Sequence, residues 1–234
     1  MKNLGIIIFV LFAQFFSAQN VYLTKVEKTH DNTDKFLYKI NEEAKNAELL
    51  GEVEVQGFSK NDAEVFSLIY KKAKEIGANA FSLKPFENID GSPQPFNPSN
   101  YKLALYYISK EKFLNQKGNI YLFASSDKAQ KISINRKDYT LSPRSYTIVK
   151  TVPGEVYAIS TKKLLGSTIK LQPKAEEENQ YFQISATKIK SDETGGLNLK
   201  SGDIIGLEKS YAEFLSTIYS RSLASLCCKV IFSS

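Results

Sequence analysis

The one histidine of the chain lies beside carboxylates, in the segment His30-Asp-Asn-Thr-Asp34, where imidazole and carboxylate groups could bind a metal ion. A transition-metal site needs three or four converging ligands, and the sequence holds no second histidine. The segment lacks the glycine and the distal glutamate of a calcium loop. A Ser-His-Asp triad would have to use His30, and the Gly-x-Ser-x-Gly turn of many serine hydrolases is absent. We therefore interpret the segment as a solvated turn.

Four other segments with possible chemistry also lack the surroundings that catalysis or phosphate binding needs. Glu42-Glu43 and Glu176–Glu178 lie in polar turn-like stretches, whereas an acid–base pair needs two carboxyls in different environments. Gly195-Gly196 is not followed by the Gly-Lys-Ser/Thr of a phosphate loop. Cys227-Cys228 has no local base, and adjacent residues are poor disulfide partners, which leaves a buried thiol pair or an intermolecular bridge. The sequence thus predicts no catalytic residue, no metal ligand and no cofactor.

The first residues, MKNLGIIIFVLFAQFFSAQN, have the layout of a secretory signal peptide. Lys2 precedes an apolar run, and the small residues Ser17-Ala18 precede polar chain. The run is shorter than the about 20 residues of a membrane span, although an uncleaved N-terminal anchor is the alternative. The ending FFSAQN resembles signal peptides of the Bacteroidetes, which implies a Gram-negative envelope protein. We predict residues 1–18 as a cleaved signal and the rest as an exported chain, periplasmic or extracellular, without a transmembrane span.

The charge and aromatic content of the chain bear on which kinds of partner it could bind. The formal net charge is +6, but the lysines are spread among glutamates and no dense basic block alternates with aromatic residues. Nucleic-acid binding is therefore not predicted. The 15 Phe and 13 Tyr, with no Trp, suit the cores of β-sheets. Removing residues 1–18 leaves about 216 residues, which is enough for two small domains.

Residues 20–110 are predicted to form an α+β domain with the order β-β-β-α-β-β. The clearest helix starts at Ser59, which is placed as its cap with Asp62 as the capping-box partner. Its apolar face recurs at helical spacing. The residues of that face are Ala63, Phe66, Ile69, Tyr70, Ala73 and Ile76. Strands are predicted around it, at 21–28, 36–40, 50–57 and 101–109.

The stretch EIGANAFSL, from Glu75 to Leu83, joins the predicted helix to a strand. Gly77 stands where a helix commonly ends in a left-handed residue. Ala78, Asn79 and Ala80 are small enough for the chain to fold back tightly against the helix. The glycine is therefore predicted to serve backbone geometry rather than a ligand.

The proline-rich stretch from 85 to 100 predicts a long surface loop, and the following strand alternates two sets of side chains. Lys102, Ala104 and Tyr106 fall on one side of the strand, and Leu103, Leu105 and Tyr107 on the other. Exposed aromatic residues on such segments form surfaces for partner proteins. We single out Phe86, Phe96, Tyr106 and Tyr107 as candidate interaction residues.

After a polar junction near 111–119, residues 117–190 are predicted to form a β-sandwich. Short strand-like runs alternate with turn residues, among them Pro153-Gly154. Residues 191–234 are predicted as a C-terminal extension, partly helical, with Ser210 as the helix cap. The apolar residues of that helix are Tyr211, Phe214, Leu215 and Ile218.

Two segments resemble known bacterial families. The run GEVEVQGFSKNDAEVFSLIYKKAKEIGANAFSL resembles the small putative heavy-metal-binding family and the outer-membrane lipoprotein sensor of the Rcs system. The shared pattern is Ala-x-x-x-Gly-Ala-Asn-Ala, here Ala73 followed by Gly77 to Ala80. This resemblance implies an α+β fold and leaves open a metal-binding or ring-forming module. The sensor's cysteines are missing here, so its disulfide-tied core does not carry over.

The second segment, from Ile132 to Ser185, looks like small β-sandwich modules of bacterial envelope proteins of unknown function. The residues that carry this likeness are Pro153, Gly154, Tyr181 and Phe182. Such modules are usually accessory. Together these features predict an exported, non-catalytic accessory or interaction protein of the cell envelope. A ligand- or metal-binding module and a secreted hydrolase are the alternatives.

Overall fold

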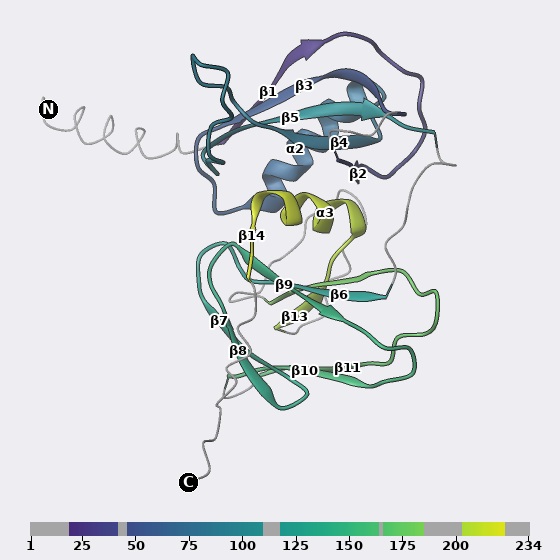
Figure 1. The fold of residues 1–234 in the computed structure, drawn as a ribbon, viewed down its shortest axis with the longest axis vertical. Helices are drawn as coiled ribbons and strands as arrows, with labels where there is room; N and C mark the ends of the chain where they lie inside the picture. Colours follow the sequence, from purple (N-terminus) through teal and green to yellow (C-terminus); the bar gives the residue numbers. More distant parts are fainter. Residues whose placement is uncertain (1–18, 42–45, 110–117, 164–165, 185–202, 223–234) are drawn as a thin grey trace, which may run out of the picture. The chain divides into compact units, whose positions relative to one another are not determined.

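The computed structural model describes residues 19–41, 46–109, 118–163, 166–184 and 203–222 (Figure 1). The described residues are rich in β-strands, arranged in several sheets, with two helices. Neither helix is long and apolar enough to cross a membrane. The predicted signal peptide, Glu42-Glu43, residues 111–117 of the predicted junction, Gly195-Gly196 and Cys227-Cys228 lie outside the described residues.

The chain divides into two compact units. The first comprises residues 1–114 together with 209–217, and the second comprises residues 115–208 together with 218–234. Residues 209–217 therefore belong to the first unit. The sequence analysis instead predicts them as part of a separate C-terminal extension, and this prediction is wrong for them.

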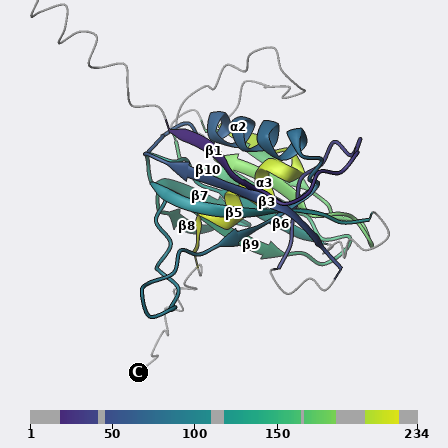
Figure 2. The same ribbon diagram turned by 90° about the horizontal axis from the view of Figure 1, so that it is seen from above.

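The first unit is a five-stranded sheet with the strand order β1-β3-β5-β4-β2 (Figures 1 and 2). Its elements are β1 (Asn20–Val26), β2 (Tyr38–Lys39), β3 (Glu48–Gln56), α2 (Asp62–Glu75), β4 (Ala80–Lys84) and β5 (Asn100–Tyr107). The predicted order β-β-β-α-β-β is confirmed. The strand predicted at 36–40 is shorter than expected, since β2 keeps only two residues, paired in parallel with β4.

Helix α2 begins two residues later than predicted. Its N-cap is Asn61, whose side chain accepts a hydrogen bond from the Glu64 N–H at 3.3 Å. The prediction of Ser59 as the cap is wrong. Its hydroxyl accepts a hydrogen bond from the N–H of Asn61 at 2.9 Å, so it bonds to the cap residue and not to a residue of the helix. Asp62 is the first helical residue and not a capping-box partner.

The buried face of α2 is formed by Val65, Ile69 and Ala73, with Ile76 buried just past the helix end. Val65 was missed at the sequence level. The predicted Phe66 is instead turned aside toward α3 (Lys209–Ile218), with its ring 5.3 Å from Phe214.

Gly77 ends α2 as predicted, in the left-handed region with φ of +79°. The Gly77 N–H bonds to the Lys74 carbonyl, and the Ala78 N–H bonds to the Ala73 carbonyl at 2.9 Å. These two bonds define a Schellman motif, which satisfies carbonyls that the helix leaves free. A Cβ at Gly77 would also lie 1.7 Å from the His30 carbonyl oxygen, so only glycine fits.

Asn79 has a structural task that explains the asparagine of the Gly-Ala-Asn-Ala motif. Its side chain is buried and forms two hydrogen bonds of 2.8 Å with the backbone of Ile108, one to its carbonyl and one from its N–H. The amide thus takes the place of a missing backbone partner where β5 ends. Because a buried polar group is stable only when it is paired, the motif is accounted for without a ligand.

Helix α3 packs within the first unit, across a long stretch of sequence. Its Ser210 lies inside the helix, so the predicted Ser210 cap is wrong; the hydroxyl accepts from the Leu37 N–H at 3.0 Å. The Glu213 carboxylate accepts from the Lys39 N–H at 2.7 Å. Side chains of α3 therefore accept hydrogen bonds from two backbone N–H groups in and next to β2.

The second unit has two sheets, with strand orders β11-β10-β7-β8 and β13-β12-β6-β9-β14. Its strands are β6 (Asn119–Phe123), β7 (Gln130–Ile134), β8 (Lys137–Leu141), β9 (Ser145–Lys150), β10 (Tyr157–Thr161), β11 (Thr168–Leu171), β12 (Gln180–Ile184), β13 (Ile204–Gly206) and β14 (Ser220–Arg221). A single apolar core joins residues of both sheets, such as Ile120 and Leu122 with Ile132 and Ile159. Two sheets sharing one core form a sandwich-like arrangement.

A strained turn in this unit gives a stability prediction. Asn135 and Arg136 connect β7 to β8 with φ of 48° and 68°, a two-residue turn that demands positive φ at both positions. We expect Arg136→Gly to raise the free energy of unfolding by about 0.5–1 kcal/mol, because glycine removes this strain. Chemical denaturation measures the change.

Asn135→Gly is the matched control for that substitution. The Asn135 side chain accepts a hydrogen bond from the Ala158 N–H at 2.8 Å, so its loss offsets any relief of strain. A stability gain at position 135 as large as that at 136 would contradict the explanation.

Candidate functional site

The two faces of the first unit's sheet differ in chemistry. Leu103 and Leu105 of β5 are buried on the face that α2 covers, whereas Lys102, Ala104 and Tyr106 lie on the opposite face. The predicted alternation along this strand is therefore confirmed. It separates the two candidate tyrosines, because Tyr107 projects to the helix side and stacks on His30 with ring centroids 3.7 Å apart.

A carboxylate surrounded by lysines lies at the centre of the opposite face. The Glu52 side chain, only 7% exposed, accepts a hydrogen bond from Lys84 at 2.6 Å and lies 3.6 Å from Lys102. Burial by itself would raise the pKa of the Glu52 carboxyl. The Lys84 hydrogen bond and the charges of Lys84, Lys102 and Lys25 outweigh burial and hold this pKa below its ordinary value of 4.5.

This shift predicts a dependence of stability on pH. A carboxyl with a lowered pKa in the folded state stabilises it above about pH 4.5, and this contribution is lost as pH falls through the folded-state pKa. We expect Glu52→Gln to destabilise the protein by about 1–2 kcal/mol at pH 7, because two lysines lose their partner. The difference from wild type should shrink toward zero in more acidic buffer, as measured by denaturation at several pH values.

Glu54→Gln is the control on the same face, since Glu54 accepts a hydrogen bond from Gln56 near the solvent. We expect a small effect at every pH. A Glu52→Gln penalty that stayed constant from pH 7 to below pH 4 would argue against a charge-based role.

Beside Glu52, the sheet face holds an open cavity of about 270 Å³. Leu49, Pro85 and Ala104 give it an apolar lining, and Lys84, Glu87 and Tyr106 add polar groups. Its volume lies at the lower end of ligand pockets, which are usually about 300–1,000 Å³. The cavity is therefore suited to a side chain or a short chemical group rather than to a large ligand.

The loop between β4 and β5 stands away from the sheet as an ordered projection (Figures 1 and 2). Asn88 and Ser92 form two hydrogen bonds, between their backbones at 2.8 Å and between their side chains at 2.9 Å. The Asp90 carboxylate accepts from both the hydroxyl and the N–H of Ser92, and these bonds lower the pKa of Asp90. Ile89, at the tip, is fully exposed.

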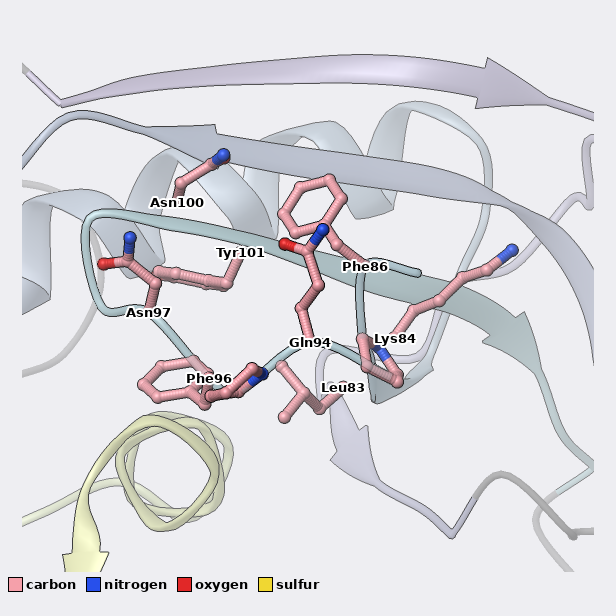
Figure 3. Close-up of a pocket in the computed structure, with 10 residues that line it drawn as sticks. Leu83, Lys84, Phe86, Gln94, Phe96, Asn97, Asn100 and Tyr101 are labelled. Atoms are coloured by element: carbon pink, nitrogen blue, oxygen red, sulfur yellow. The ribbon is translucent and has the colours of Figure 1, made fainter. Parts of the chain in front are cut away.

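Two aromatic residues anchor the base of this loop. The Phe86 ring lies 5.0 Å from the Lys102 ammonium, and the Phe96 ring lies 5.6 Å from Tyr101. Between them is a small pocket of about 40 Å³, into which Gln94 extends (Figure 3). Each end of the loop is therefore packed against a residue of β5.

The structure thus brings Phe86 and Phe96 together at the base of the loop, places Tyr106 in the lining of the larger cavity, and places Tyr107 against His30. Sequence reasoning missed Ile89 and the Glu52–Lys84–Lys102 cluster. A signal for the cluster was present, because Glu52 and Glu54 alternate with Val53 and Val55 in β3, as Lys102 alternates with Leu103 in β5. Pro153 and Gly154 form a turn in the second unit, as predicted, with Gly154 at φ of +85°.

The lysine with the largest pKa shift has a structural role. Burial lowers the pKa of Lys74 to about 8, partly offset by the charge of Asp34. Its ammonium donates to the carbonyls of Asp34, Phe36 and Ala78 at 2.7–3.0 Å. All three protons of the charged amine are therefore engaged by backbone, which ties the segment before β2 to the end of α2.

The segment from His30 to Asp34 also contacts the end of α2. Asn32 donates to the Gly77 carbonyl at 3.0 Å, and His30 lies 3.8 Å from the Glu48 carboxylate. The prediction of a solvated turn is wrong for Asp34, which is buried and accepts a hydrogen bond from the Phe36 N–H. Within the ranges that the structure describes, no three His, Cys, Asp or Glu side chains are grouped so that they could hold a metal ion.

Comparison with known proteins gives no relative: no protein family matches the chain, and no curated protein or solved structure does.

Proposed function

We propose that the chain is an exported, non-catalytic interaction protein of a bacterial cell envelope, built from an α+β unit and a β-sandwich unit. The projecting 85–99 loop is its docking element. The export signal expected at residues 1–18 and the resemblance of the second unit to β-sandwich modules of envelope proteins favour this compartment.

The observation that carries the proposal is the exposure of Ile89 on a loop that is held in place by hydrogen bonds. Exposed large apolar residues on a monomer are commonly scattered, but an ordered loop that presents one at its tip has little entropy left to lose on binding. Fixed loops that carry apolar and polar groups together are typical binding elements.

The chemistry of the charged groups favours binding over catalysis. Those with shifted pKa values, such as Glu52 and Lys74, are satisfied by partners inside the first unit. Catalytic groups instead need an approach for substrate beside the reacting atom. The alternative of a ligand-binding module is favoured by one feature, the cavity beside Glu52, whose polar and apolar lining would accept a small amphipathic molecule.

Native mass spectrometry of the protein, purified gently from its own envelope fraction after mild cross-linking in cells, tests this function. We expect a defined second polypeptide, present with wild type and reduced at least tenfold with Ile89→Ser. Leu68→Ser, an exposed substitution on α2, is the matched control and should retain the partner.

A bare chain with no cross-linked polypeptide would overturn the proposal. A stoichiometric small molecule or metal ion would favour the ligand-binding alternative instead. A partner retained equally by Ile89→Ser and wild type would exclude the loop as the docking element.

A further inference from the structure

The loop tip and the cavity beside it are complementary in size and in chemistry. Ile89 offers one branched apolar side chain, and the cavity of about 270 Å³ offers an apolar floor of Leu49, Pro85 and Ala104. For scale, an engineered cavity of about 150 Å³ is large enough to hold benzene. One isoleucine with part of its turn would therefore fit.

The charges are complementary as well. The loop from 85 to 99 carries Glu87 and Asp90 and no Lys or Arg, whereas the whole chain has a net charge of +6. The acidic loop is thus a segment that a second copy of this basic chain would attract. The cavity lining carries one charge of each sign, Lys84 and Glu87. Lys84 pairs with Glu52 and is still partly exposed, so it is the cation that the Asp90 of another copy would approach.

The loop and the cavity are neighbours on the molecule, because Glu87 belongs to the loop and also lines the cavity. When a projection and its acceptor adjoin, a two-fold axis can place each projection in the acceptor of the other copy at once. Such an isologous contact closes on itself and forms a dimer rather than a filament.

We propose that two copies of the chain dimerise through the first unit, with Ile89 of each copy inserted into the Leu49–Ala104–Tyr106 cavity of the other. The inference rests on the proposed function and names the partner as a second copy. The contact is small, so the dimer is weak and forms reversibly. Its charged part makes it weaker at high salt.

Sedimentation velocity of the exported protein, over a wide concentration range, tests the dimer. We expect a monomer–dimer equilibrium whose dissociation constant rises about 30-fold with Ile89→Ser, as for a central apolar contact. Val152→Ser, an exposed position of the second unit, should leave it unchanged. Both substitutions lie on the surface, so loss of folding does not explain a difference.

Mixed cross-linking tests the geometry. One preparation carries Ile89→Cys and another Leu49→Cys, both with Cys227→Ser and Cys228→Ser. A disulfide-linked dimer should form on mixing under mild oxidation, and a mixture of Ile89→Cys with Val152→Cys should give at least tenfold less.

A monomer at every concentration, or a dimer indifferent to Ile89→Ser, would overturn this inference. If such a monomer still bound a different envelope polypeptide through Ile89, the proposed function would stand and the self-association would fail. If Ile89→Ser changed neither dimerisation nor partner binding, both would fail.

Discussion

Replacing Gly77 with alanine is expected to lower the free energy of unfolding by about 3–5 kcal/mol. Two costs add at this position. The left-handed backbone, with φ of +79°, is unfavourable for alanine, and the new Cβ would lie 1.7 Å from the His30 carbonyl oxygen. That oxygen is backbone, so either the His30 segment or the end of α2 must move. Urea denaturation, followed by circular dichroism, measures the loss.

Gly91→Ala is a close control, because Gly91 has the same φ of +79° and a methyl group added there would meet nothing within 4 Å. We expect a loss of only about 1–2 kcal/mol there, the cost of the backbone conformation alone. Equal losses at the two glycines would show that the close approach of His30 contributes nothing.

Phe214→Ala is expected to destabilise the first unit by about 3–5 kcal/mol, although residue 214 lies between the two segments of the second unit in the sequence. The Phe214 ring is fully buried and lies 5.3 Å from the ring of Phe66 on α2. Its truncation leaves a cavity between α3 and α2, which the surrounding side chains fill only in part. Hydrogen exchange followed by mass spectrometry, together with denaturation, localises the effect.

We expect amide protection in α2 and β2 to fall at least tenfold in Phe214→Ala, with protection in β7 and β10 kept. Phe58→Ala, at a largely exposed aromatic position of the first unit, is the control and should change protection little. If the loss of protection were confined to β7 and β10, α3 would stabilise the second unit rather than the first.

The Gly77 result bears on how the 85–99 loop is held. Gly77 and Asn79 fix the start of β4, and β4 leads directly into the 85–99 loop. A substitution that moves the end of α2 is therefore expected to shift the loop, because only β4 separates the two. Under the proposed function, we expect substitutions at the loop tip to lower binding, and substitutions at the junction to lower stability first.

Features that depend on neighbouring residues could be predicted from the amino-acid sequence alone. The period of apolar side chains indicated α2 and the strands, and the glycine after α2 marked a left-handed end, because backbone sterics act within a few residues. The alternation along β5 separated charged from apolar side chains before any partner strand was known. Prolines between 93 and 98 indicated the loop, since proline cannot donate to a sheet.

Features that depend on pairing between distant segments emerged only in the folded chain. Ser59 and Asn61 are both good cap residues, and only the path of the chain leaving β3 selected Asn61. The apolar face of α3 could pack on the core of either unit, so the sequence does not say which one it belongs to. Contacts with Phe66, Leu37 and Lys39 place it in the first unit.

The candidate site is one of the features that depend on pairing between distant segments. Glu52, Lys84 and Lys102 come from three strands that meet only when the sheet forms. The cavity likewise needs residues of β3, β4 and β5, namely Leu49, Lys84 and Ala104, together with the start of the loop. A sequence pattern records which side of a strand is charged. It does not record which strands are neighbours, because strand order is set by the total burial of apolar surface over the whole unit.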